Sequence, residues 1–176
     1  MKITYFVHGT TTDNETGRAT GWLPGELSQL GIEQSKKLPE LVKDSSFEVV
    51  YASDLQRAID SAELAFGKTH QIRTDMRLRE ANYGDFNGQP HSFKDSMKEY
   101  VDTPFPNGES YKDAEAHMRS FIGEVKGLGL QHIAIVASEA PQLALEVIAN
   151  GKTWEQAIDQ NWRRRKAWQP GWIYEV

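Results

Sequence analysis

Two short apolar runs constrain the fold of this 176-residue chain more than any other feature of its sequence. They span Ile3 to Val7 and Ile133 to Ala137. Both runs are too apolar for a strand with one face in water, so each predicts a strand covered on both sides. Segments with helical spacing lie between them, and strands that alternate with helices form largely parallel sheets. The sequence therefore predicts an α/β sandwich with a mostly parallel central sheet.

Weaker patterns predict the remaining elements. Phe47 to Ala52 and Ile72 are strand candidates, and Gly9 to Gly25 has the composition of a loop. Helices are predicted at Leu30 to Val42, from a Ser53 or Asp54 cap to Phe66, at Ser92 to Val101, after Ser110, and from Ala140 or Pro141 until Gly151. The helix after Ser110 is capped with Asp113 and is expected to turn Met118, Phe121 or Ile122, Val125 and Leu128 inward.

Composition excludes several classes of function. The formal net charge of −5 argues against a general nucleic-acid binder, and no apolar stretch is long enough to span a membrane. The first residues do not have the pattern of a signal peptide, and the absence of cysteine excludes disulfides, thiolate metal sites and a Cys nucleophile. We expect one domain over residues 1–176, located in the cytoplasm.

Reactive side chains follow the two most apolar strands. His8 and Gly9 follow the first, and Ser138 and Glu139 follow the second. Ligands of parallel sheets bind at the carboxyl ends of strands. Arg57 falls near the start of a predicted helix, where the helix dipole favours anions, so it is either a surface ion-pair residue or a fork for a phosphate or carboxylate.

Together, these segments resemble the histidine phosphatase superfamily, also called the phosphoglycerate mutase-like family. The resemblance runs in order through nearly the whole chain. It rests on His8-Gly9 with Asn14, Thr20-Gly21-Trp22, Leu27 to Gly31, Ser53 to Ala58 with Arg57, Leu78-Arg79-Glu80 with Tyr83-Gly84 and Asn87-Gly88, and Gly108-Glu109-Ser110. It implies a three-layer α/β/α sandwich with a phosphate-sized pocket.

The resemblance also implies a covalent mechanism without a metal or other cofactor. His8 would attack the phosphorus of a small phosphomonoester, and water would discharge the phosphohistidine. Arg57 would hold phosphate oxygens, Asn14, Thr20 and Gly21 would line the pocket, and Glu80 would donate a proton to the leaving group.

Two positions depart from the family pattern. Val7 stands where the family has Arg, and Ser138 stands where it has a second His. Glu139 then replaces a usual Gly and brings a negative charge beside a site for dianions. Losing one preorganised charged donor costs about 10²–10³ in rate, so any phosphatase activity is expected to be impaired.

Two alternatives to a phosphatase follow from these departures. Ser138 could act as the nucleophile of an esterase, with His8 as base and the following helix N-terminus as oxyanion site, or it could merely fill space. A missing His and a new Ser would suit an engineered variant of such a scaffold. The chain could also be a non-catalytic protein that binds phospho-ligands through Arg57.

One further feature is the basic run from Arg163 to Lys166, which lies among tryptophans. It could grip an anion, but in an acidic chain a solvated face beside aromatic packing is the favoured interpretation.

Overall fold

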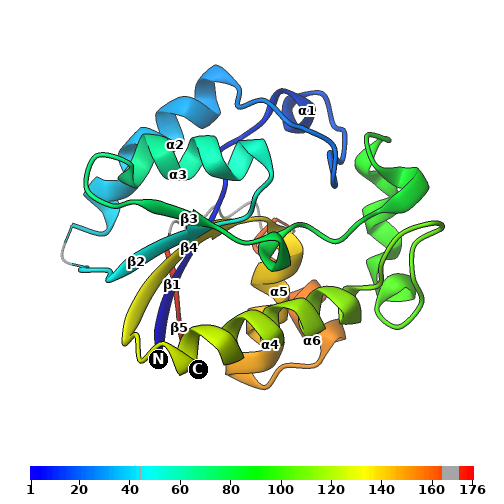
Figure 1. Ribbon diagram of the computed structural model, residues 1–176. Coiled ribbons are helices and arrows are strands. Elements are labelled where there is room, and N and C mark those ends of the chain that lie inside the picture. Colours follow the sequence, from blue (N-terminus) through cyan, green and yellow to red (C-terminus); the bar gives the residue numbers. More distant parts are fainter. Residues whose placement is uncertain (44, 164–170) are drawn as a thin grey trace.

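The computed structural model describes residues 1–43, 45–163 and 171–176. Its centre is one sheet, shown in Figure 1, with the strand order β3-β2-β4-β1-β5. The strands are β1 (Lys2–Val7), β2 (Val49–Ala52), β3 (Ile72–Thr74), β4 (His132–Ala137) and β5 (Trp172–Glu175). All neighbouring pairs run parallel except β1 with β5. The expected mostly parallel α/β sheet is confirmed, with the two most apolar runs side by side at its centre.

Helices cover both faces of the sheet and make three layers (Figure 1). One layer holds α2 (Gln29–Leu41) and α3 (Gln56–Phe66), and the other holds α4 (Tyr111–Gly127), α5 (Glu139–Asn150) and α6 (Trp154–Asp159). Shorter segments are α1 (Thr12–Glu15) and the 3-10 segments η1 (Met76–Leu78), η2 (Gly84–Phe86) and η3 (His91–Tyr100). No helix in the described part of the chain is both long enough and apolar enough to cross a bilayer.

Burial on both faces explains the composition of the central strands. On the α2 and α3 side, Phe6 of β1 packs against Phe47 and Phe66, with ring centroids 6.4 and 5.4 Å away. On the other side, Tyr5 and Ile3 join a larger cluster that reaches α4 and α5. Alternate residues of one strand therefore enter two separate cores, which leaves no wet face on β1.

Two glycines bring the loop after β1 onto α2. A Cβ on Gly9 would collide with the carbonyl of Gly31, and a Cβ on Gly31 would collide with the backbone of Thr10. Ser28 caps α2 and also donates from its hydroxyl to the carbonyl of Thr10 at 3.2 Å. This close contact fixes the backbone next to His8.

Some predicted details are wrong. Neither Ser53 nor Asp54 caps α3, because its N-cap is Leu55 and Asp54 is instead held by Arg79 in two hydrogen bonds of 2.6 Å. Leu128 lies beyond the end of α4 and is 58% exposed rather than inward.

The sequence patterns also missed elements. A short helix, α1, interrupts the expected loop of residues 9–25. The helix predicted over residues 92–101 is the 3-10 segment η3. The elements α6 and β5 were not predicted. These elements are short or lie at an edge, so their local patterns are weak.

Candidate active site

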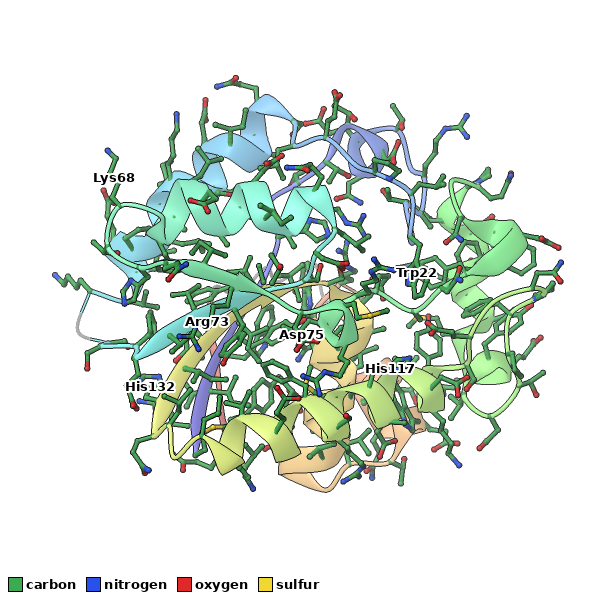
Figure 2. The ribbon with its side chains drawn as sticks, in the orientation of Figure 1. Trp22, Lys68, Arg73, Asp75, His117 and His132 are labelled. Atoms are coloured by element: carbon green, nitrogen blue, oxygen red, sulfur yellow. The ribbon has the colours of Figure 1, made fainter. Side chains whose placement is uncertain are left out.

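The candidate site is a cavity of about 390 Å³ at the carboxyl ends of the strands. His8 follows β1, Glu139 follows β4, and Arg57 lies in the first turn of the helix after β2. In Figure 2, Trp22 lies towards this end of the sheet and His132, at the start of β4, lies at the other. The parallel topology thus gathers residues that are far apart in sequence.

His8 and Arg57 form the centre of the site. The Arg57 Nε–H donates to Nε2 of His8 at 3.1 Å, and Nδ1 of His8 lies 2.7 Å from the carbonyl oxygen of Gly9. Since a guanidinium can only donate, Nε2 carries the lone pair and Nδ1 carries the proton that is donated to Gly9. The two contacts therefore fix the tautomer of His8.

Burial keeps His8 neutral. Only 8% of the residue is exposed. Burial, the nearby Arg57 charge and the more distant charges of Arg163 and Lys94 lower the pKa of His8 well below its usual value, although the bond to Gly9 opposes them. His8 therefore keeps its lone pair at and below neutral pH.

The remaining groups of Arg57 fix its guanidinium from the other side. Its two terminal nitrogens donate to the carbonyls of Gly21, at 2.7 Å, and Leu23, at 3.2 Å. Gly21 has a φ of +57°, and a Cβ there would collide with the side chain of Asn87, so this turn requires glycine. Three of the five N–H groups of Arg57 are used in these contacts, and no other described residue accepts from the remaining two.

Glu80 is buried and binds backbone donors. Its Oε1 accepts from the N–H of Ala81 at 3.1 Å and of Ala140 at 2.9 Å, and its Oε2 accepts from the N–H of Glu139 at 3.2 Å. Trp22 Nε1 donates to the carbonyl of Glu80 at 2.6 Å and fixes its backbone. Glu80 therefore lines the cavity and caps the N-terminus of α5 at the same time.

Glu139 is the second buried carboxyl group of the cavity. It accepts from Lys94 Nζ at 2.6 Å and from Asn161 Nδ2 at 2.5 Å, and Nε of Arg163 lies 3.3 Å away. Burial alone would raise the pKa of Glu139, but the two cations and the hydrogen bonds lower it to about 2. Its negative charge is thus balanced within the protein.

Ser138 does not occupy the position that an esterase would need. It is fully buried, it is not among the residues that line the cavity, and its Oγ has no hydrogen-bond partner in the described residues. The predicted Ser–His pair with His8 is therefore not formed. The N–H groups of α5 that would serve as an oxyanion site are bound by Glu80. The esterase hypothesis receives no support from these contacts.

The other predicted binding residues line the cavity. Asn14, Thr20 and Gly21 all reach it. The Thr20 hydroxyl donates to Asp13 at 2.8 Å, and the Asn14 side chain accepts from the N–H of Thr11 at 3.1 Å in the capping box of α1. Their orientation is thus set by local contacts.

Several residues of the cavity were not predicted. They are polar or basic residues of η3 and its surroundings, and they include Arg18, Lys94 and Asn161. Each is a single polar residue in an irregular segment, so no sequence pattern marks it. Arg163 belongs to the basic run that was interpreted as a solvated face, and the structure brings its side chain to the cavity. Residues 164–166 of that run lie outside the described residues.

The described residues contain no group of side chains that could form a metal centre. Within residues 1–43, 45–163 and 171–176, no three His, Asp or Glu side chains are placed to hold a metal ion. The groups available at the cavity are a buried imidazole, a fixed guanidinium and two buried carboxyl groups.

Comparison with known proteins shows similarity to one superfamily and to phosphatases. The sequence model of the histidine phosphatase superfamily (branch 1) matches residues 5–163. Phosphoserine phosphatase 1 of Hydrogenobacter thermophilus is 26% identical over 156 residues, which are 82% of this chain and 74% of that protein. Glucosyl-3-phosphoglycerate phosphatase of Mycobacterium tuberculosis is 32% identical over 127 residues, or 67% of this chain and 57% of that protein.

Solved structures agree with this result. The structure of mycobacterial glucosyl-3-phosphoglycerate phosphatase in complex with VO3 has a TM-score of 0.79 and 26% identity. The match covers 90% of this chain and 86% of that one. The similarity therefore extends over most of both chains.

Proposed function

The chain belongs to the histidine phosphatase superfamily, and from this premise we propose that it hydrolyses small phosphomonoesters through a phosphohistidine at His8. The observation that carries the proposal is the pair of contacts on the His8 ring. They leave Nε2 as the lone-pair nitrogen, at the cavity, in contact with a buried guanidinium. A neutral imidazole beside a fixed cation is what nucleophilic attack on a phosphate dianion requires.

The first step transfers the phosphoryl group to the protein. Nε2 of His8 gives up its hydrogen bond from Arg57 and forms a bond to phosphorus, while the bond from phosphorus to the ester oxygen breaks. The released Nε–H of Arg57, together with the two N–H groups that no described residue uses, binds phosphate oxygens, and Glu80 supplies a proton to the departing alkoxide. In the second step water attacks phosphorus, the phosphorus–nitrogen bond breaks, and Glu80 takes the proton of the water.

We expect this reaction to be slow. Val7 provides no guanidinium next to His8, and Ser138 provides no second imidazole. A transition state with charge on three phosphate oxygens is stabilised by each preorganised donor, and removing one costs about 10²–10³ in rate.

The test is to trap the phosphorylated protein. We expect brief incubation with p-nitrophenyl phosphate to attach one phosphoryl group to the peptide that contains His8, as measured by mass spectrometry at alkaline pH. His8→Asn should remove this label and reduce turnover by about 10³-fold or more. His117→Asn is the matched control, because His117 is exposed on α4 and contacts Glu109 away from the cavity (Figure 2). A label on another residue, or unchanged turnover in His8→Asn, would contradict the proposal.

A non-catalytic phospho-ligand-binding protein is the second candidate function. The observation that favours it is that both oxygens of Glu80, the group that would have to donate a proton, already accept hydrogen bonds from three backbone N–H groups. Phosphate binding without labelling and without turnover would support this candidate against the phosphatase.

A further inference from the structure

The carboxylate of Glu139 joins three separate parts of the chain at the cavity. Only 2% of this residue is exposed. Lys94 reaches it from η3, and Asn161 and Arg163 reach it from the segment after α6. Two cations on one carboxylate leave a net charge of +1, so the group is attractive to an anion.

Both cations keep donors that Glu139 does not use. An ammonium has three N–H groups and a guanidinium has five; Lys94 donates one of its groups to Glu139, and Arg163 forms an ion pair with Glu139 through Nε at 3.3 Å. In the described part of the chain, Glu139 is the only carboxylate that pairs with either cation. Their side chains are 22% and 36% exposed, and both line the cavity. A ligand in the cavity can therefore reach both of them.

Their charges also act at the nucleophile. After burial and the charge of Arg57, the charges of Arg163 and Lys94 contribute to the lowered pKa of His8. The same positive potential that disfavours a proton on His8 favours an anion bound beside it. Arg57 balances only one of the two negative charges of a phosphate dianion, and neither Val7 nor Ser138 carries a positive charge.

We propose that Lys94 and Arg163 bind phosphate oxygens as a second cationic group besides Arg57, and that Glu139 is the internal anion with which phosphate competes for them. The inference rests on the phosphate pocket of the proposed function, but it concerns binding rather than turnover. In this proposal Glu139 lowers the affinity of the cavity for phosphate. Phosphate can bind Lys94 and Arg163 only by weakening the ion pairs that these two residues form with Glu139.

Isothermal titration with inorganic phosphate tests this proposal through opposite effects. Lys94→Met and Arg163→Gln should each weaken phosphate binding by about tenfold or more, because a charge-assisted hydrogen bond is lost. Glu139→Gln should strengthen phosphate binding by about tenfold, because the two cations lose their competing anion. Lys98→Met is the matched control, since Lys98 is on the same segment and pairs with the exposed Asp159 at 2.7 Å outside the cavity.

If Glu139→Gln folds poorly, the melting temperature with and without phosphate provides a second test. Phosphate should then raise the melting temperature of Glu139→Gln by more than that of the unaltered protein, because it replaces the missing counter-charge. Lys94→Arg should retain phosphate binding within a few-fold. The proposal is overturned if phosphate binding is absent, if Lys94→Met binds like Lys98→Met, or if Glu139→Gln gains neither affinity nor stabilisation.

Binding and turnover separate this inference from the proposed function. Phosphate binding that depends on Lys94, in a protein that hydrolyses no phosphomonoester, would retain the second cationic group and reject the phosphatase. Labelling of His8 with phosphate binding unaffected by Lys94→Met would retain the phosphatase and reject the second cationic group.

Discussion

At the scale of single residues, the carboxyl group of Glu80 would serve two roles. It caps α5 through backbone N–H groups, and the proposed reaction needs it to give a proton to the leaving oxygen. Its hydrogen-bond partners in the described residues are backbone donors, and a general acid is needed only where the leaving oxygen departs poorly without a proton. The benefit from Glu80 therefore depends on how much the leaving group needs a proton.

Glu80→Gln tests this dependence with two substrates. Nitrophenolate leaves without a proton, whereas an alkoxide does not. We expect turnover of an alkyl phosphate to fall by about 10²–10⁴-fold, the usual contribution of general acid catalysis, and turnover of p-nitrophenyl phosphate to fall by less than about tenfold. Steady-state kinetics with both substrates on one preparation controls for folding. Equal losses with both substrates would exclude Glu80 as the acid.

At the scale of elements, helix N-termini in this protein are capped in two ways. Ser110 caps α4 in a capping box with Asp113, with a bond of 3.2 Å from the N–H of Asp113. Ser138 is the N-cap residue of α5, but its side chain makes no capping bond, and Glu80 serves from a distant part of the sequence instead. The same residue type at the same helical position therefore has a different energetic role.

Two matched substitutions measure this difference. Ser110→Ala should lower the free energy of unfolding by about 1 kcal/mol, the usual effect of losing an N-cap. Ser138→Ala should leave it unchanged or raise it, because it removes a buried hydroxyl that has no partner in the described residues. Urea denaturation of both variants measures the effect. A loss in Ser138→Ala as large as that in Ser110→Ala would show that the Ser138 hydroxyl forms a stabilising contact.

At the scale of the whole molecule, burial of His8 makes stability depend on pH. The folded-state pKa of His8 lies well below its unfolded value of about 6.5. Below that pH the unfolded chain binds a proton that the folded protein does not. The stabilisation linked to His8 is therefore present above about pH 6.5 and is lost as the pH falls.

Urea denaturation at about pH 7.5 and about pH 5.5 tests this linkage. A single group of this kind loses at most about 1.4 kcal/mol over that interval, the value reached when the folded protein takes up no proton there. We expect His8→Asn to reduce the pH-dependent loss by about this amount and His117→Asn to leave it unchanged. His132, whose pKa burial also lowers, should account for part of the remaining loss. The Glu139 carboxylate, with its pKa near 2, does not titrate in this interval. An unchanged slope in His8→Asn would contradict the buried, neutral imidazole.

Some kinds of structural feature could be predicted from the sequence and others could not. The central strands were predictable because burial on both faces requires apolar residues at every position, and α4 was predictable because its cap and its apolar face are local patterns. The cap of α3 was mispredicted because Asp54 finds a stronger partner in Arg79, which lies 25 residues away. The edge strand β5 has one exposed and one buried face over four residues, which is too little for a clear pattern.

The sequence by itself determined the central strands, the family and the identity of several groups at the cavity, among them His8, Arg57 and Glu80. These follow from local periodicity and from the order of the motifs along the chain. Only the tertiary structure decided how those groups are used: that Glu80 binds the start of α5, that Ser138 is buried away from His8, and that Lys94 meets Glu139. These contacts join residues 45 or more positions apart. Local sequence cannot specify them, because hydrogen bonding and burial depend on which distant segments the fold brings together.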